Sequence, residues 1–81
     1  HQRGLSWHDR REYDKAIADF DEAIRLDPKN AVFYNSRSIT WRAVGKFDDS
    51  IKDNDEAIRL EPKFTRAYVS RGLAWHQKKE Y

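Results

Sequence analysis

The histidines and cysteines of this 81-residue chain limit the metal and nucleophile chemistry that it could perform. The chain has three histidines and no cysteine, which excludes thiolate metal sites, disulfides and thiol nucleophiles. His8 and His76 lie far apart in the chain, and each is the only histidine on its turn, so neither has the spacing of a zinc ligand pair. The sequence also has no Gly-rich phosphate loop. We therefore expect no catalytic residue, no metal site and no cofactor, and predict that the chain is not an enzyme.

Three tryptophans recur at a constant spacing, at Trp7, Trp41 and Trp75. Exposed aromatic side chains could form a ligand cage or a stacking platform. A small residue precedes each tryptophan by three positions, at Gly4, Ser38 and Gly72. Large and small residues at constant spacing are what helical hairpins need in order to stack on one another. We favour this packing role over ligand binding.

An arginine and an acidic residue also recur. The arginines are Arg3, Arg37 and Arg71, and the acids that follow are Asp19 and Asp53. We predict that Arg37 pairs with Asp19 or Asp53, because two antiparallel helices can bring such groups together. A partly buried bidentate pair of this kind fixes helix orientation better than it raises stability. We expect its role to be structural.

These residues belong to an internal repeat with a period of about 34 residues. The segment 21–29 returns at 55–63 with a single change, Asp27 to Glu61, and the segment 3–13 returns in part at 71–81. A period of this length indicates a solenoid or another repeat array. The chain is long enough for one small domain.

Each period contains two helical stretches. Apolar residues such as Ile17, Phe20 and Ile24 recur every three or four positions, which indicates one face of a helix. Pro28, Pro62 and Gly45 mark helix ends. We expect Asp14 and Asp48 to cap two of the helices. The predicted helices, about five in all, span residues 1–10, 14–27, 31–44, 48–61 and 65–79.

The pattern resembles the tetratricopeptide repeat family. In the middle unit the family's positions are occupied by Tyr34, Ser38, Trp41, Ala57 and Pro62. The outer copies supply more of the pattern, with Gly4, Gly72, Ala16, Phe20, Tyr68 and Trp75. The chain departs from the pattern where the three arginines replace a leucine, and where Ser50 and Asn54 replace an alanine and a phenylalanine. We expect the middle unit to pack less tightly for this reason.

The resemblance implies an all-α, right-handed solenoid of antiparallel helix hairpins. The whole chain, 1–81, would be one solenoid with a partial first repeat (1–30), a complete second repeat (31–64) and a partial third repeat (65–81).

The resemblance also implies a concave groove lined by the first helix of each repeat. The matching positions are Leu5, His8, Asp9, Val32, Asn35, Ser36, Ile39, Arg42, Arg66, Val69, Ser70, Leu73, His76 and Gln77. An aliphatic row of Leu5, Ile39 and Leu73 would lie beside cationic and hydrogen-bonding groups. Such a groove suits a peptide or helix of a partner protein that supplies apolar anchors and acidic groups.

One family ligand can be tested against the sequence. Relatives that hold the acidic C-terminal tails of chaperones use Lys, Asn, Asn, Lys and Arg at places that are here His1, Leu5, Ser36, Arg66 and Ser70. Only Arg66 retains the required chemistry, so we expect no chaperone-tail binding.

Other partners and roles are open to weaker arguments. The net charge of +2 comes from 16 basic and 14 acidic residues, which does not predict nucleic-acid binding. No apolar run is long enough for a membrane span. Two other functions stay open, namely a structural spacer or oligomerisation segment in a larger multidomain protein, and an RNA-binding helical array. The compartment is undetermined, and we favour the cytoplasm.

The ends of the sequence suggest self-association. We expect the helix at 65–79 to present Tyr68, Gly72 and Trp75 to a further helix that the sequence does not contain. The chain also reads as a possible fragment of a longer array. We predict that copies associate through these open ends, with residues 65–81 at the contact.

Overall fold

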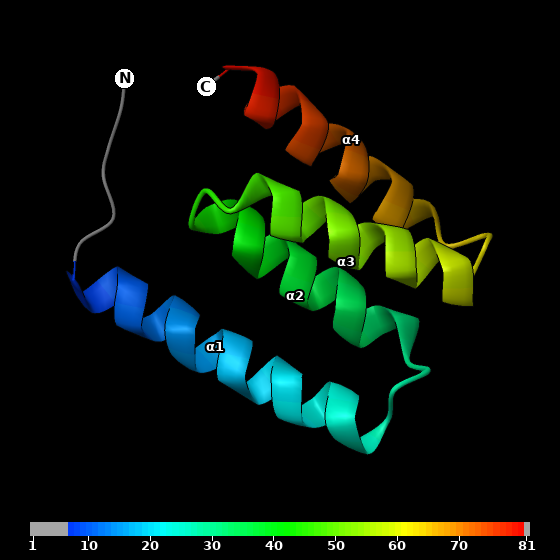
Figure 1. Cartoon of the computed structure of the whole chain (residues 1–81), viewed down its shortest axis with the longest axis horizontal. Coiled ribbons are helices and arrows are strands. Elements are labelled where there is room, and N and C mark those ends of the chain that lie inside the picture. The colour runs from blue at the N-terminus through cyan, green and yellow to red at the C-terminus, as the bar shows by residue number, and fades with distance from the viewer. Residues whose placement is uncertain (1–6, 81) are drawn as a thin grey trace.

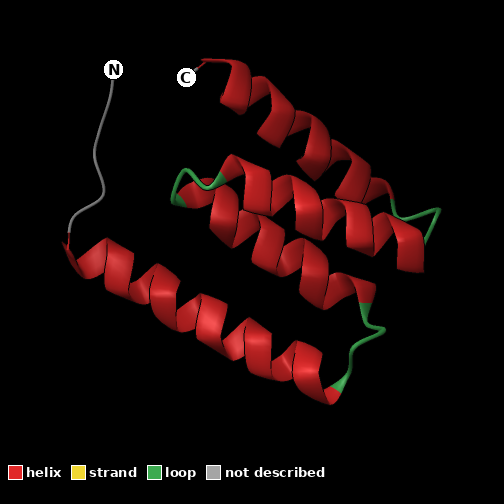
Figure 2. Cartoon of the chain, in the orientation of Figure 1, coloured by secondary structure: helices red, strands yellow, loops and turns green. Residues whose placement is uncertain are grey.

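The computed structural model describes residues 7–80, and the side chains of residues 11–79. Within this part of the chain there are four helices and no strand: α1 (Trp7–Leu26), α2 (Ala31–Ala43), α3 (Phe47–Leu60) and α4 (Thr65–Glu80). Successive helices run in opposite directions and pack side by side, and α2 also contacts α4 (Figures 1 and 2). The predicted all-α repeat fold is confirmed.

The prolines end two of the helices as predicted. Helix α1 ends at Leu26 and α3 at Leu60, so that Asp27 and Glu61 lie outside the helices and precede Pro28 and Pro62. The proline ring disfavours helical geometry in the residue before it, which explains both ends.

Helix α2 ends at Ala43, just before the glycine that the sequence singled out. Gly45 has a φ of 85°. Its N–H donates to the carbonyl of Arg42 at 3.1 Å, and the N–H of Lys46 donates to the carbonyl of Trp41 at 2.9 Å. These two bonds form a Schellman motif, which satisfies carbonyls at the helix end. Gly45 thereby reverses the chain and starts the α2–α3 hairpin.

The N-terminal part differs from the prediction of two separate helices. The expected helix at 1–10 lies partly outside the described residues, and the break before Asp14 is absent because α1 runs unbroken from Trp7 to Leu26 (Figure 1). Arg11 stands one repeat period before Gly45, at the place where a turn would need a left-handed residue. A non-glycine residue adopts that conformation at a cost of roughly 1–2 kcal/mol, so the helix continues through Arg11.

The predicted aspartate caps are also wrong. Asp14 lies inside α1, and α3 begins after Lys46, whose side chain makes no capping bond, so that Asp48 falls in the first turn of the helix. The cap that the sequence reading missed is Asn30, whose Oδ1 accepts the N–H of Val32 at 3.0 Å. Asparagine is among the residues preferred at this position, so its type was the available signal.

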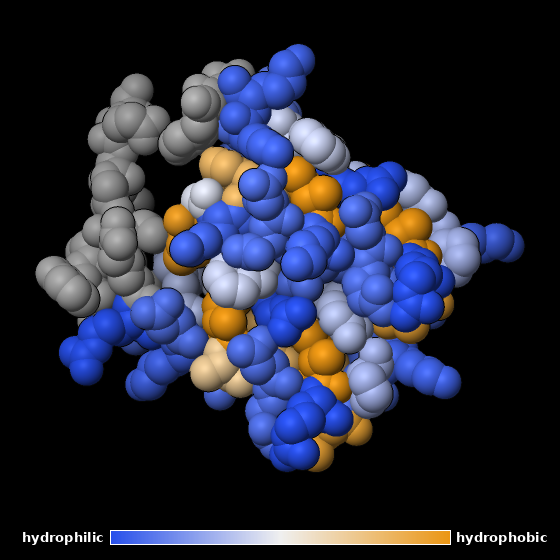
Figure 3. All heavy atoms as spheres, in the orientation of Figure 1, coloured by the Kyte–Doolittle hydropathy of each residue, from blue (hydrophilic) through white to orange (hydrophobic). Residues whose placement is uncertain are grey.

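The interior is small and partly polar. Ala31, Ala57 and Ala67 form a buried cluster where α2, α3 and α4 meet, and four larger side chains pack around it: Tyr34, Ile58, Leu60 and Phe64. The largest fully buried side chains are polar: Asn54, Ser38 and Ser50. Hydrophilic residues dominate the face shown in Figure 3, with smaller apolar areas visible among them.

Two contrasting environments exist among these buried polar groups. The hydroxyls of Ser38 and Ser50 lie 2.7 Å apart and share a hydrogen bond across the α2–α3 interface. Neither Oδ1 nor Nδ2 of Asn54 has a hydrogen-bond partner. A buried unpaired amide costs about 1–3 kcal/mol, so Asn54 weakens the middle unit.

Candidate functional site

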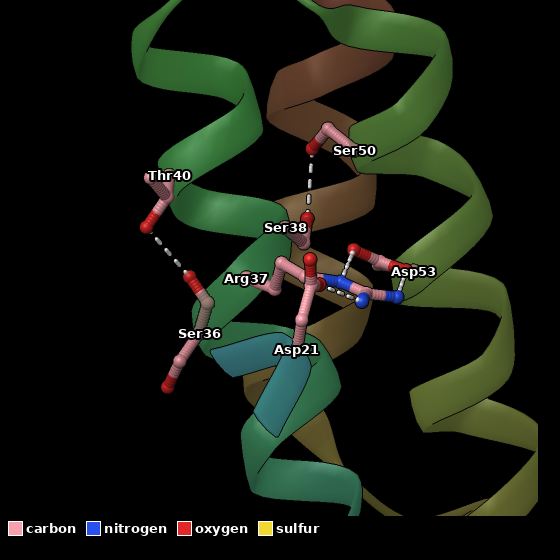
Figure 4. Close-up of polar contacts among 7 residues, drawn as sticks. All are labelled: Asp21, Ser36, Arg37, Ser38, Thr40, Ser50 and Asp53. Carbon is pink, nitrogen blue, oxygen red and sulfur yellow. Dashed lines mark hydrogen bonds and ion pairs between the residues drawn. The ribbon is translucent and has the colours of Figure 1, made fainter. Parts of the chain in front are cut away.

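Arg37 of α2 connects the helices on either side of it (Figure 4). Its Nε and Nη2 each donate to the carboxylate of Asp53 in α3 at 2.8 Å, and its Nη1 donates to Asp21 in α1 at 2.6 Å. The predicted pair with Asp53 is confirmed, and the alternative pair with Asp19 is wrong. Asp21 accepts the bond from Arg37 instead of Asp19. Helix α1 belongs to the preceding unit and contacts α2 through a different side of α1.

The inter-unit half of this arrangement repeats. Arg71 donates from Nη1 to Asp55 at 2.7 Å, which reproduces the bond from Arg37 to Asp21 one repeat period later. Each arginine also lies over a tyrosine three positions earlier, with 5.7 Å from Arg37 to the Tyr34 ring centre and 5.4 Å in the second case. The geometry supports a structural role for these arginines.

The Arg37–Asp53 pair is shielded from water. The side chains of Arg37 and Asp53 are 20% and 9% exposed. The hydrogen bonds to Asp53 raise the pKa of Arg37 above its ordinary value, and burial opposes this only in part. Since three of its nitrogen donors already have acceptors, Arg37 is poorly placed to hold a ligand.

The tryptophans are less buried than the packing interpretation requires. Trp41 is half-buried, whereas Trp75 is 49% exposed and has the ammonium of Lys78 5.0 Å from its ring centre. The side chain of Trp7 lies outside the described residues. The difference follows from the fold, because α3 follows α2 in a hairpin and the described chain has no such helix after α4.

Four aliphatic side chains at the predicted groove positions of α2 and α4 are exposed. Ile39 and Leu73, one repeat period apart, are 45% and 44% exposed, and Val32 and Val69 are more exposed still. Leu5, the third member of the predicted row, lies outside the described residues, as do the side chains of His8 and Asp9. We define the aliphatic surface as Val32, Ile39, Val69 and Leu73.

Three further groove positions on the same two helices carry nitrogen hydrogen-bond donors, namely Arg42, Arg66 and His76. Arg66 and His76 are exposed on α4. Arg42 on α2 is half-buried, and its Nε is buried without a hydrogen-bond partner.

The uncharged polar positions are less accessible. Asn35 and Ser70 are buried, at 6% and 4% exposure. Ser36 and Gln77 are half-buried, and the carbonyl of Ser36 accepts the hydroxyl of Thr40 at 3.1 Å. These residues add little polar area to an exposed surface.

The sequence reading missed a surface hollow of about 510 Å³ beside the α1–α2 and α3–α4 loops. Its lining residues are Asp27, Lys29, Asn30, Ala31, Val32, Glu61 and Phe64. The two Pro-Lys loops that recur with the repeat were the available signal. Val32 lines the hollow and also belongs to the aliphatic surface. The hollow therefore adjoins the N-terminal end of that surface.

The described residues hold no cluster of three or more His, Cys, Asp or Glu side chains arranged for a metal ion. None of the described helices has both the length and the apolar character needed to cross a bilayer.

Comparisons with known proteins agree with this architecture. Two family models described as tetratricopeptide repeat match residues 1–30 and 42–81, which leaves only 31–41 unmatched. No curated protein matches the sequence. Repeats of this family generally mediate protein–protein interaction and are typically non-enzymatic. With its internal sequence repeat, its antiparallel helices and these two matches, the chain belongs to the tetratricopeptide repeat family.

Proposed function

We propose that the chain is a protein-interaction module that binds a peptide or helix of a partner protein across α2 and α4. The observation that carries this proposal is the aliphatic surface, whose four members are all at least 44% exposed. Exposed apolar side chains that gather on one surface often mark an interaction site. The proposal assumes that the chain divides into repeats at 1–30, 31–64 and 65–81.

The order of residues along the two helices suggests the chemistry of the ligand. Helix α2 presents Val32, Ile39 and then Arg42, and α4 presents Arg66, Val69, Leu73 and then His76. The two helices run in the same direction (Figure 1). On α4, Val69 and Leu73 therefore lie between Arg66 and His76, and on α2 Arg42 follows the two apolar side chains.

The length of this surface sets the size of the ligand. His76 follows Arg66 by ten positions along the helix, which corresponds to about 15 Å at 1.5 Å per residue. An extended peptide covers that length with about five residues. A ligand with one or two central aliphatic residues and an acidic residue on either side fits this pattern.

A display library of random peptides provides the test. Selected peptides would be synthesised with a fluorescent label, and their binding measured by anisotropy against the wild type and the Ile39→Glu and Leu73→Glu variants. Leu26→Glu is the matched control, because Leu26 is 70% exposed and lies on α1.

We expect the groove variants to bind about tenfold to a hundredfold more weakly, since a charge would replace an apolar contact at the centre of the surface. The control should bind like the wild type, and all variants should keep their helical circular dichroism. Selected peptides that bind both groove variants as well as the wild type would place the site elsewhere. No specific observation favours the spacer or RNA-binding alternatives.

A further inference from the structure

The hollow lies between two turns of the same geometry. In the α1–α2 loop the N–H of Asn30 donates to the carbonyl of Asp27 at 3.2 Å. In the α3–α4 loop the N–H of Phe64 donates to the carbonyl of Glu61 at 3.0 Å. Each is a four-residue β-turn with Pro-Lys at its centre, and both lie at the end of the helices opposite the α2–α3 turn (Figure 1). Each turn therefore supplies one acidic residue to the lining of the hollow, Asp27 from the first and Glu61 from the second.

The last position of the turn differs between the two loops, and the two residues there give the hollow different properties. Asn30 donates from Nδ2 to Oδ2 of Asp27 at 3.2 Å while its Oδ1 caps α2, so the carboxylate of Asp27 is held in place. Phe64 is half-buried and packs against the buried alanine cluster. Together with Ala31 and Val32 of α2, it gives the hollow an apolar wall.

The carboxylates of the hollow have no cation of their own. Asp27 and Glu61 are exposed, and neither makes an ion pair with another residue in the described part of the chain. Lys29 also lines the hollow and is exposed. Two carboxylates and one ammonium give the lining a net negative charge. Because lysine has a flexible four-carbon stem, Lys29 can extend its ammonium into water and leave the carboxylates accessible.

We propose that the hollow binds a lysine or arginine side chain of the partner peptide, an inference that rests on the function proposed above. The stem of that side chain packs along Phe64 and Ala31, and its charged end reaches Asp27 and Glu61. Lysine and arginine side chains commonly bury their stems on apolar surface while the charged end stays in polar surroundings. The volume of about 510 Å³ lies within the range of small-ligand sites, about 300–1,000 Å³. Since Val32 also belongs to the aliphatic surface, the basic residue lies next to the apolar residues of the peptide.

An anion is the competing occupant, because Lys29 and the first turn of α2 both favour negative charge. Two N–H groups of that turn are already used. The N–H of Val32 donates to Oδ1 of Asn30, and the N–H of Phe33 donates to the carbonyl of Asn30 at 3.2 Å. An anion would also lie beside two carboxylates, so the charge of the lining favours a cation.

NMR titration of the isotopically labelled full chain tests the occupant with three small probes. The probes are the N-acetyl methylamides of arginine, of citrulline, which has the shape of arginine without its charge, and of aspartate. The arginine probe should shift the backbone amides of Ala31, Val32 and Phe64 as its concentration rises, and the other two should shift them much less. No shift with the arginine probe, an equal shift with citrulline, or a larger shift with aspartate would overturn the proposal.

Charge-neutral variants assign the binding to the two carboxylates. Asp27→Asn and Glu61→Gln each remove one charge with little change in size, and the first keeps an acceptor for Asn30. Each should weaken binding of the arginine probe about twofold to fivefold, as expected for one exposed ion pair, whereas Lys29→Ala should strengthen it. Asp49→Asn is the matched control, because it removes the same charge from an exposed position in the first turn of α3. If the control weakens binding as much as the other two, the net charge of the chain and not the hollow attracts the probe.

The peptides selected from the display library separate this proposal from the function on which it rests. We expect them to carry a basic residue, and its replacement by citrulline should weaken binding to the wild type about twofold to tenfold. The same replacement should have no effect on binding to a variant with both Asp27→Asn and Glu61→Gln. Peptides that depend on Ile39 and Leu73 but not on a basic residue would support the groove and refute the hollow. Arginine-probe binding at the hollow, without any selected peptide that depends on Ile39 or Leu73, would support the hollow and refute the groove.

Discussion

Replacing Asp53 with alanine should be one of the most costly single changes in the chain. Asp53 accepts two bonds of 2.8 Å from Arg37, and its side chain is only 9% exposed. Hydrogen bonds to charged groups contribute about 1.5–3 kcal/mol, and removal of one member of a buried pair costs more because the other charge stays desolvated. Arg37 keeps Asp21 and is 20% exposed, so we expect Asp53→Ala to cost about 2–3 kcal/mol.

That loss is large for a domain of this size. At 0.05–0.15 kcal/mol per residue the chain has a stability of about 4–12 kcal/mol. The Tm, followed by circular dichroism at pH 7, should fall by about 8–24 °C. At pH 7 Arg37 contributes its full stabilisation. Its pKa is raised in the folded state, so its contribution is complete below the ordinary arginine pKa and is lost only as the pH rises through the folded value.

Two other aspartates act as controls for burial. Asp21 and Asp55 make single bonds to Arg37 and Arg71, and their side chains are 56% and 55% exposed. Exposed pairs of this type contribute less than about 1 kcal/mol, so Asp21→Ala and Asp55→Ala should each lower the Tm only slightly. If either control costs as much as Asp53→Ala, burial of the bidentate pair is not what makes it important.

Two further changes test the polar interior and the hairpin turn. Asn54→Leu removes a buried amide that has no partner, so it should raise the free energy of unfolding in urea by about 1 kcal/mol; an unchanged or lower value would mean that the amide is satisfied or that leucine does not fit. Gly45→Ala forces a left-handed φ of 85° on a residue with a Cβ atom. The free energy of unfolding should therefore fall by about 1–2 kcal/mol, and a stabilised variant would contradict the strain argument.

The parts of the fold that depend on local chain geometry could be predicted from the sequence. The repeat period indicated the array, and Pro28, Pro62 and Gly45 indicated three helix ends because each acts through its own backbone geometry. The long α1 required comparison of one position across repeats. Arg11 occupies the repeat position of Gly45. The prediction of separate helices at 1–10 and 14–27 did not take that difference into account.

Features that depend on how helices meet were harder to predict. The sequence indicated that Arg37 would pair with an acid, but the choice of Asp21 over Asp19 depends on which side of α1 faces α2. The sequence also did not indicate which of the predicted groove positions are buried. Asn35 and Ser70 are buried, although they belong to the same predicted set as exposed residues. The hollow at the loops also arises from segments that lie one repeat period apart in the chain.

The bonds from Arg37 to both neighbouring helices have a consequence for how the array unfolds. If α1 frays, Arg37 loses its bond to Asp21, and the guanidinium that holds Asp53 becomes more hydrated and more mobile. Arg71 extends the same dependence from α3 to α4. In the language of a one-dimensional Ising chain, these arginines contribute to the nearest-neighbour coupling and not to the intrinsic stability of a single unit. Coupling of this kind makes a row of individually weak helices melt cooperatively.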